Sequence, residues 1–274
     1  MDRLYSLKDK VIIITGATGL LGSQHAEVVA EAGGIPVLLD LDQEKCSQLA
    51  KELKQKYSVD AVGYKVDITN EKEIIDNCAI LKEKFKSVHA LINNAANNPK
   101  VEDSSEKAFS RLENFPISIW NSDLAVGLTG SFLCSKHFGF LIAQNVEGGT
   151  ILNISSDLGL IAPDQRLYKK TGLADELQPV KPVTYSVVKA GLIGLTRYLA
   201  TYWADKNVRC NAICPGGVEN NQNVDFLKEV TSRIPLGRMA KKDEYQGLVL
   251  FLLSDSASYL NGSIISADGG RSVW

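Results

Sequence analysis

Two side chains suited to proton transfer, Tyr185 and Lys189, stand four residues apart in the sequence. That spacing places both on the same face of a helix, one turn apart. A phenol with a pKa of about 10 is a poor base at neutral pH, but a nearby ammonium group stabilises its ionised form. The pair is therefore a candidate general acid/base, although a Tyr–Lys pair alone is equally typical of an exposed helix face.

A glycine-rich stretch, TGATGLLG at residues 15–22, follows an aliphatic run. Its glycines, Gly16, Gly19 and Gly22, permit a tight turn and let backbone N–H groups approach a pyrophosphate at a helix N-terminus. Asp40 follows Gly22 by 18 residues, near the spacing of an acid that accepts hydrogen bonds from ribose. Its charge would repel a 2′-phosphate, so the sequence favours NAD over NADP. The alternative for Asp40 is a solvated turn residue.

The elements that must position these residues follow from the hydrophobic pattern. Short aliphatic runs alternate with longer amphipathic stretches, as in parallel βαβ units. Helices fill the intervals, the first beginning near Leu20 and another capped by Asn70, three residues before Glu73. The pattern predicts one α/β domain over residues 1–274, a Rossmann-type doubly wound parallel sheet of about seven strands with helices on both faces. The predicted strands are residues 11–15, 35–39, 61–66, 88–93, 150–155, 208–213 and 263–267.

Three stretches do not fit the alternation: residues 96–116, 160–182 and 216–238. Each follows the C-terminal end of a predicted strand, the edge of an open parallel sheet where ligands bind, so we expect these loops to form substrate walls. The second contains Arg166 and two lysines, which either hold an anionic or polyhydroxylated substrate or form a solvated basic turn. Amide side chains at residues 220–223 favour a polar substrate over an acyl chain.

Composition excludes several classes of partner. The 274 residues include 30 Lys and Arg and 32 Asp and Glu, which gives a net charge of −2. This charge argues against non-specific binding to nucleic acid or to an anionic membrane. The five cysteines are widely spread and lack the CxxC pairs of zinc sites, so we expect no metal and a reducing compartment. No secretory leader or apolar span is recognisable, which predicts a cytoplasmic protein that binds a small molecule.

The sequence resembles the short-chain dehydrogenase/reductase family over most of its length. The resemblance rests on the glycine loop, DIT at 67–69, NNAA at 93–96, NISS at 153–156 with Gly159, the Tyr185–Lys189 pair, RCNAICPG at 209–216 and DGG at 268–270. The family implies the strand order 3-2-1-4-5-6-7, with a nicotinamide cofactor bound where that order reverses. It also implies a homotetramer or dimer, built by long helices near residues 116–144 and 184–204.

The resemblance also assigns roles to residues. Tyr185 would be the general acid/base, and Lys189 would bind ribose and lower the pKa of Tyr185. Ser156 would bind the reacting oxygen, with Ser155 as the runner-up, and the alternative for either is a hydroxyl bonded to local backbone. Asp67 would cap the adenine or else begin a helix. Besides Tyr185 and Lys189, the implied cofactor site comprises Gly16, Thr18, Gly19, Leu20, Gly22, Asp40, Asp67, Ile68, Asn93, Ala95, Pro215, Gly216 and Val218.

Three features depart from the family's common pattern. The glycine spacing puts Leu20 where a middle glycine commonly falls, and it resembles the extended branch that includes sugar-nucleotide epimerases and dehydratases. Gly127 stands in AVGLTG, where the family has the asparagine of its catalytic tetrad. Ser156 and Tyr185 are 29 residues apart, more than the family commonly has, so residues 160–182 contain an insertion.

The sequence is also similar to the flagellin-modification protein A type, a subgroup linked with nonulosonic (legionaminic) acid biosynthesis. This similarity rests on the insertion, on AVGLTG and on PVTY at 182–185. That likeness implies an NAD-dependent oxidoreductase that interconverts a secondary alcohol and a ketone on a sugar or amino-sugar phosphate. One alternative is an NADP-dependent carbonyl or 3-oxoacyl reductase, which Asp40 opposes. The glycine spacing is also compatible with an epimerase or a dehydratase. Gly127, in place of the tetrad asparagine, is also compatible with a non-catalytic nicotinamide-binding protein.

Overall fold

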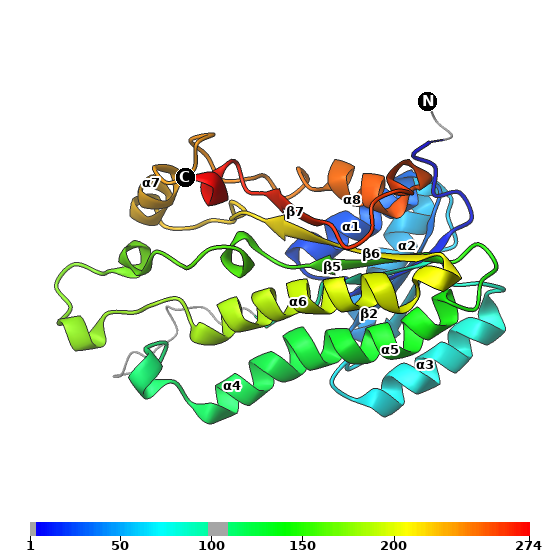
Figure 1. The fold of residues 1–274 in the computed structure, drawn as a ribbon, viewed down its shortest axis with the longest axis horizontal. Coiled ribbons are helices and arrows are strands. Elements are labelled where there is room, and N and C mark those ends of the chain that lie inside the picture. The colour runs from blue at the N-terminus through cyan, green and yellow to red at the C-terminus, as the bar shows by residue number, and fades with distance from the viewer. Residues whose placement is uncertain (1–3, 98–108) are drawn as a thin grey trace.

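The protein folds around one parallel sheet of seven strands, seen in a computed structural model that describes residues 4–97 and 109–274 (Figure 1). The strand order is β3-β2-β1-β4-β5-β6-β7. Both the doubly wound sheet and this order are confirmed, and each predicted strand end lies within two residues of the observed one. The strands are β1 (Val11–Thr15), β2 (Ile35–Asp40), β3 (Val62–Lys65), β4 (Ala90–Asn93), β5 (Gly149–Ile154), β6 (Val208–Pro215) and β7 (Ile264–Ala267).

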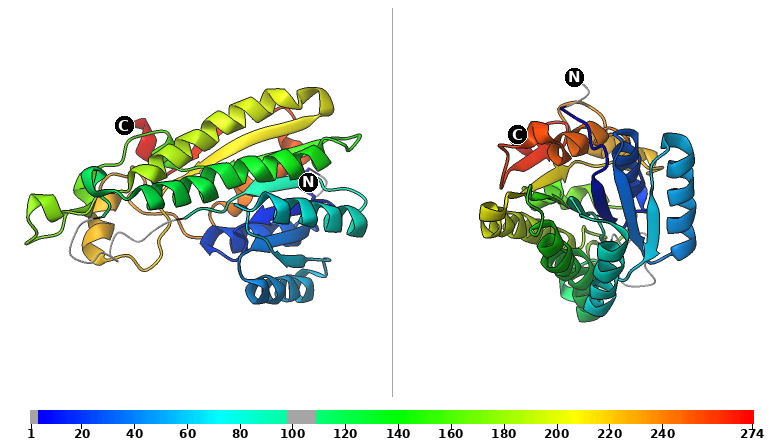
Figure 2. Two further views of the ribbon diagram at one scale, coloured as in Figure 1. Left: turned by 90° about the horizontal axis from the view of Figure 1, so that it is seen from below. Right: turned by 90° about the vertical axis from the view of Figure 1, so that its right-hand side faces the viewer.

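Helices cover both faces of the sheet (Figure 2). In β1, Ile12 and Ile14 face one apolar core, while Val11 and Ile13 face the other. The first core is closed by α1 (Leu20–Glu31), α2 (Gln43–Tyr57) and α8 (Gln246–Leu253). The second is closed by α3 (Glu71–Lys84), α5 (Ser131–Ile142) and α6 (Val183–Tyr202). Because a central strand is buried on both faces, its sequence is continuously aliphatic rather than alternating.

The predicted cap at Asn70 is present at the start of α3. The Asn70 side chain accepts a hydrogen bond from the backbone N–H of Lys72. Glu73 does not complete the reciprocal arrangement of a capping box, because its carboxylate accepts from the Asn70 side-chain amide and from the backbone N–H of Asp67. The carboxylate of Glu73 therefore ties the end of β3 to the first turn of α3.

The insertion between β5 and α6 packs against α7 (Val224–Thr231) at one end of the molecule, on the left of Figure 1. Leu167 is buried there with Val230 and Ile234, and the rings of Tyr168 and Phe226 lie 6.0 Å apart. This small third core joins two of the predicted substrate loops, 160–182 and 216–238. In the remaining predicted loop, 96–116, residues 98–108 lie outside the described residues.

A long helical stretch, Ile117–Ile142, joins α4 (Ile117–Leu124) to α5 through a π-helical segment at Ala125–Gly130. Among the described residues it is the one stretch long and apolar enough to cross a membrane by composition alone, and half of that apolar window is buried in the fold. The π-helical segment contains Gly127, which packs against Val188 of α6.

Close packing of α2 on β3 depends on Gly63. A Cβ atom at this position would lie 2.6 Å from the backbone carbonyl carbon and oxygen of Cys46. We therefore expect Gly63→Ala to lower the free energy of unfolding by about 1 to 3 kcal/mol, because the helix must move away from the strand. Gly247→Ala, on α8 with no atom within 4 Å of its added Cβ, is the matched control. Urea denaturation measures both, and equal midpoints would contradict this account of the packing.

Candidate active site

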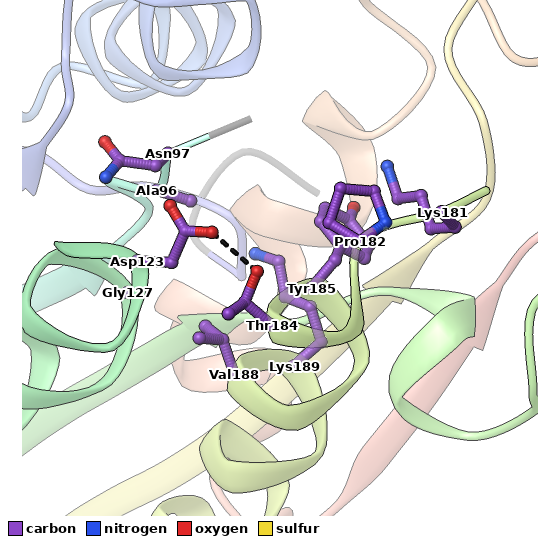
Figure 3. Close-up of a pocket in the computed structure, with 10 residues that line it drawn as sticks. All are labelled: Ala96, Asn97, Asp123, Gly127, Lys181, Pro182, Thr184, Tyr185, Val188 and Lys189. Carbon is purple, nitrogen blue, oxygen red and sulfur yellow. Dashed lines mark hydrogen bonds between the residues drawn. The ribbon is translucent and has the colours of Figure 1, made fainter. Parts of the chain in front are cut away.

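The candidate site lies at the edge of the sheet formed by the C-terminal ends of its strands. Figure 3 shows a pocket there with Asp123 and Asn97 on one side, Tyr185, Pro182 and Lys181 on the other, and the Lys189 amine between them. These residues come from the end of β4, from α4 and from the start of α6. The structure therefore brings together segments that are distant in sequence, as the predicted topology requires. The pocket is lined by Ala96, Asn97, Asp123, Gly127, Lys181, Pro182, Thr184, Tyr185, Val188 and Lys189.

Lys189 is buried and joins α6 to the end of β5. Its Nζ donates to the carbonyl of Ile154 at 2.8 Å, and its own carbonyl accepts from the Ser155 hydroxyl at 2.7 Å. Burial lowers the pKa of Lys189 to about 8. One of its three N–H donors is occupied by Ile154, which leaves others to bind a ligand.

The two candidate serines have different partners. Ser155 is committed to the Lys189 carbonyl, and Gly159 packs closely over the same peptide, where a Cβ would lie 2.9 Å from the backbone of Lys189. Ser156 lies on the Tyr185 side, where its hydrogen bond lowers the pKa of the phenol. Ser155 therefore has the local backbone role that was its alternative interpretation. Ser156 also bonds local backbone, by accepting from the Leu158 N–H at 3.2 Å, and its role as the substrate-binding serine stays a prediction.

Tyr185 is held protonated by its surroundings. Burial is the largest cause of its raised pKa, and the negative charge of Asp157 raises it further. Nζ of Lys189 lies 5.9 Å from the centroid of the Tyr185 ring. The family resemblance implies that Lys189 lowers the pKa of this phenol, but no such effect of Lys189 is found. Desolvation therefore outweighs the ammonium at this distance.

A second ammonium, missed in the sequence, lies closer to Tyr185. Nζ of Lys181 is 3.8 Å from the centroid of the phenol ring, a cation–π distance. Burial lowers the pKa of Lys181 to about 8. Its position four residues before Tyr185 is the only signal that the sequence offers for it.

A buried ion pair, also missed, stands behind Ser156. Asp157 Oδ1 accepts from the Ser156 hydroxyl at 2.8 Å, and Oδ2 accepts from the Arg271 guanidinium at 2.9 Å. Both side chains are almost fully buried. Arg271 follows the DGG motif near the C-terminus, so no local sequence signal links it to Asp157.

The glycine loop has the close packing that a dinucleotide site requires. Gly16 has a φ of +61°, which disfavours any side chain, and a Cβ on Gly22 would lie 2.1 Å from the Gly16 carbonyl oxygen. Gly19 is the N-cap of α1 and has no side chain that could bond the N–H groups of the first turn. These features fit the pyrophosphate of a nicotinamide dinucleotide. Leu20 begins α1 and is partly exposed beside the loop.

Asp40 ends β2 beside this loop. Its Oδ2 accepts from the backbone N–H and the hydroxyl of Thr18, at 2.9 and 2.7 Å, and its Oδ1 accepts from the N–H of Leu41 at 2.8 Å. A carboxylate oxygen accepts two hydrogen bonds, so Oδ1 retains capacity for a ribose hydroxyl. Asp40 is therefore a fixed residue of the loop rather than a solvated turn residue.

Asn93 does not point toward the glycine loop. Its side chain is buried in the sheet, where it donates to Asn153 at 2.8 Å and to Ser135 at 3.0 Å. The next residue, Asn94, donates instead to the carbonyls of Thr15 and Gly16 at 2.9 and 3.1 Å. The side chain that supports the cofactor loop is thus Asn94, which the sequence reasoning missed because both asparagines belong to one motif.

The remaining predicted cofactor residues lie at the same edge. Asp67 makes a local turn by accepting from the N–H and hydroxyl of Thr69, and it does not begin α3, whose N-cap is Asn70. Ile68 packs against the π-helical segment. Ala95 lies against Gly16. Pro215 ends β6, Gly216 continues its pairing to Ala267, and Val218 pairs with Ala240.

An asparagine at position 127 would have to displace the Val188 side chain in this packing. A Cβ there would lie 2.4 Å from Cγ1 of Val188, the residue immediately before Lys189. The Gly127 carbonyl accepts from the Ser131 hydroxyl at 2.9 Å. The departure from the family pattern is therefore a steric match between α6 and the π-helical segment.

The predicted substrate-binding groups of the loops are largely bonded to one another. Arg166 forms a two-point ion pair with Asp164, which also binds Arg233 at 2.7 Å. In the third loop, Gln222 donates to the Val218 carbonyl, and Asn223 caps α7. These contacts fix the two loops to each other and favour structural roles for the named side chains.

Comparison with known proteins identifies relatives along the whole chain. A family model described as enoyl-(acyl carrier protein) reductase matches residues 16–272. The chain is 33% identical to the 3-oxoacyl-[acyl-carrier-protein] reductase FabG of Aquifex aeolicus, over 96% of this chain and 98% of that protein. It is 28% identical to the post-translational flagellin modification protein A of Campylobacter coli, over 96% and 98%.

Among solved structures, the crystal structure of gox2181 matches with a TM-score of 0.87 and 25% identity, covering 100% of this chain and 99% of the other. Its similarity supports the same seven-stranded sheet. With the matched family model and the 33% identical relative, the chain belongs to the short-chain dehydrogenase/reductase family of oxidoreductases.

Proposed function

We propose that the protein interconverts a secondary alcohol and a ketone on a polar sugar or amino-sugar phosphate, with NAD as the cofactor. The observation that carries the proposal is the convergence of Ser156, Tyr185 and Lys189 at one sheet edge with Asp40 and the glycine loop. Such an arrangement joins a proton-transfer group to a dinucleotide site.

Each residue has a defined part in this reaction. A bound nicotinamide ring supplies the acceptor or donor of the hydride. Tyr185 takes the hydroxyl proton of the alcohol, or gives its own proton to the ketone oxygen. Lys189 holds ribose hydroxyls while Ile154 fixes its ammonium group. Ser156 orients the reacting oxygen beside Tyr185.

A polar substrate is supported by the pocket lining. Asn97, Asp123, Lys181 and Thr184 place amide, carboxylate, ammonium and hydroxyl groups around Tyr185. Asp123 accepts from the Thr184 hydroxyl at 2.5 Å, and both side chains are buried. A lining of such groups favours a hydroxylated substrate over an acyl chain, because an acyl chain makes no hydrogen bonds to them.

A second candidate is an NADP-dependent 3-oxoacyl reductase, favoured by the 33% identity to a protein of that name. Asp40 opposes it, because the carboxylate lies where a 2′-phosphate would add negative charge, and no ion pair to Asp40 is found in the described part of the chain. Cofactor preference therefore separates the two candidates.

The first prediction concerns Tyr185. With NAD and a panel of hexoses, amino sugars and their phosphates, we expect NADH formation that Tyr185→Phe lowers by about a hundredfold or more, because the phenylalanine has no proton to exchange. NAD affinity, measured by fluorescence titration, should change little. A Tyr185→Phe protein that retains most of its activity would refute the assignment. Silence across the panel with NAD still bound would favour another alcohol or the non-catalytic interpretation.

The second prediction concerns Asp40. We expect the protein to bind NAD in preference to NADP, and Asp40→Asn to reduce that preference by about tenfold, because the repulsion of the 2′-phosphate is removed. Asp42→Asn is the matched control, since Asp42 is exposed and caps α2 two residues away. Dissociation constants for both cofactors measure the effect. An equal preference in the unmodified protein would favour the reductase candidate.

A further inference from the structure

Asp123 is a buried carboxylate that lines the candidate pocket from α4. Its Oδ2 accepts from the Thr184 hydroxyl at 2.5 Å, and the two residues are 7% and 1% exposed. Its Oδ1 has no hydrogen-bond partner within residues 4–97 and 109–274. Burying a carboxylate costs free energy unless its oxygens receive hydrogen bonds, so Oδ1 is an acceptor that a ligand in the pocket can use.

An opposite charge lies in the same pocket. Figure 3 shows the Lys189 amine between Asp123 and Tyr185. No ion pair to Asp123 is found among the residues that the structure describes, and Lys189 has N–H donors beyond the one that binds Ile154. A hydroxyl group can donate to a carboxylate and accept from an ammonium group. The pocket therefore suits a group that both donates and accepts hydrogen bonds.

The free space among the lining side chains suits a small group. It amounts to about 10 Å³, close to what one water molecule requires. A hydroxyl group is of that size, and it brings a donor for Oδ1 of Asp123. A methylene group in the same place brings no donor, so the accepting capacity of Oδ1 would stay unused.

We propose that Asp123 is a specificity-determining residue, which accepts a hydrogen bond from a second hydroxyl group of the substrate, close to the carbon that is oxidised or reduced. The substrate class is then a polyhydroxylated alcohol or its hydroxyketone, and a simple secondary alcohol is a poor substrate. Thr184 holds Oδ2, which leaves Oδ1 for the substrate. The inference rests on the proposed function, because it concerns the substrate of the same alcohol–ketone reaction.

The test measures binding without turnover. The protein carries Tyr185→Phe, so that ketones are not reduced, and is loaded with NADH or NADPH, whichever it binds more tightly. The probes are 2-butanone, 3-hydroxy-2-butanone and 4-hydroxy-2-butanone, and cofactor fluorescence gives their dissociation constants. We expect at least one hydroxyketone to bind about tenfold more tightly than 2-butanone. Asp123→Leu should reduce that preference to less than about twofold, because leucine has no acceptor.

A matched variant separates this role from a structural one. The Asp123–Thr184 bond also joins α4 to α6, and both Asp123→Leu and Thr184→Val remove it. Thr184→Val keeps the carboxylate, so we expect it to retain the preference for the hydroxyketone. If Asp123→Leu fails to fold, the double variant Asp123→Leu with Thr184→Val supplies an apolar pair, and it should lack the preference. Equal losses in Thr184→Val and Asp123→Leu would overturn the proposal.

The remaining outcomes also decide the inference. Equal affinities for the three ketones, no binding of any of them, or a preference that persists in Asp123→Leu would overturn it. Turnover of the sugar panel by the protein with Tyr185 intact tests the proposed function separately. An inactive panel together with a preference that depends on Asp123 would count against the proposed function alone. Turnover of the panel without such a preference would overturn this inference alone.

Discussion

A single buried ammonium group links the fold to the chemistry. Lys189 donates to the carbonyl at the end of β5, and the serine that follows that carbonyl donates back to Lys189. These two bonds fix the start of α6 against the sheet edge, one turn after Tyr185. Any change in the β5–α6 contact would therefore move the Tyr185 phenol, Ser155 and the Lys189 ammonium together. Gly159 and Gly127 permit this contact, because side chains there would meet the Lys189 backbone and Val188.

Around this contact, the polar groups of the site lie in successive layers, starting from the sheet. Ser155 and Lys189 form the layer next to the sheet, and in the proposed reaction Ser156 and Tyr185 form the layer that meets a substrate. Asp157 and Arg271 lie behind Ser156, so a residue near the end of the sequence helps to fix the Ser156 hydroxyl. A buried ion pair contributes little net stability when its desolvation is counted. Its position here is better explained by the orientation that it imposes on one hydroxyl.

Much of this could be predicted from the sequence, since local patterns determine it. The seven aliphatic runs predicted the strands, and the glycine loop with Asp40 predicted the edge of the sheet where the cofactor binds. Both predictions were possible because each signal lies within a short segment. Contacts between distant segments could not be predicted. Nothing near Arg271 indicates Asp157, and nothing in the Asn93–Asn94 pair indicates which side chain faces the loop. The raised pKa of Tyr185 was also missed, because it depends on burial, which only the folded structure determines.

We propose that Lys189 binds the end of β5 and the cofactor at the same time. A crystal structure of the protein with NAD tests it most directly. The account predicts that Nζ keeps its bond to the Ile154 carbonyl and lies within about 3.2 Å of a nicotinamide-ribose hydroxyl, with Asp40 accepting from the adenine ribose. A cofactor bound away from Lys189, or a Lys189 that abandons Ile154 to reach it, would contradict the account.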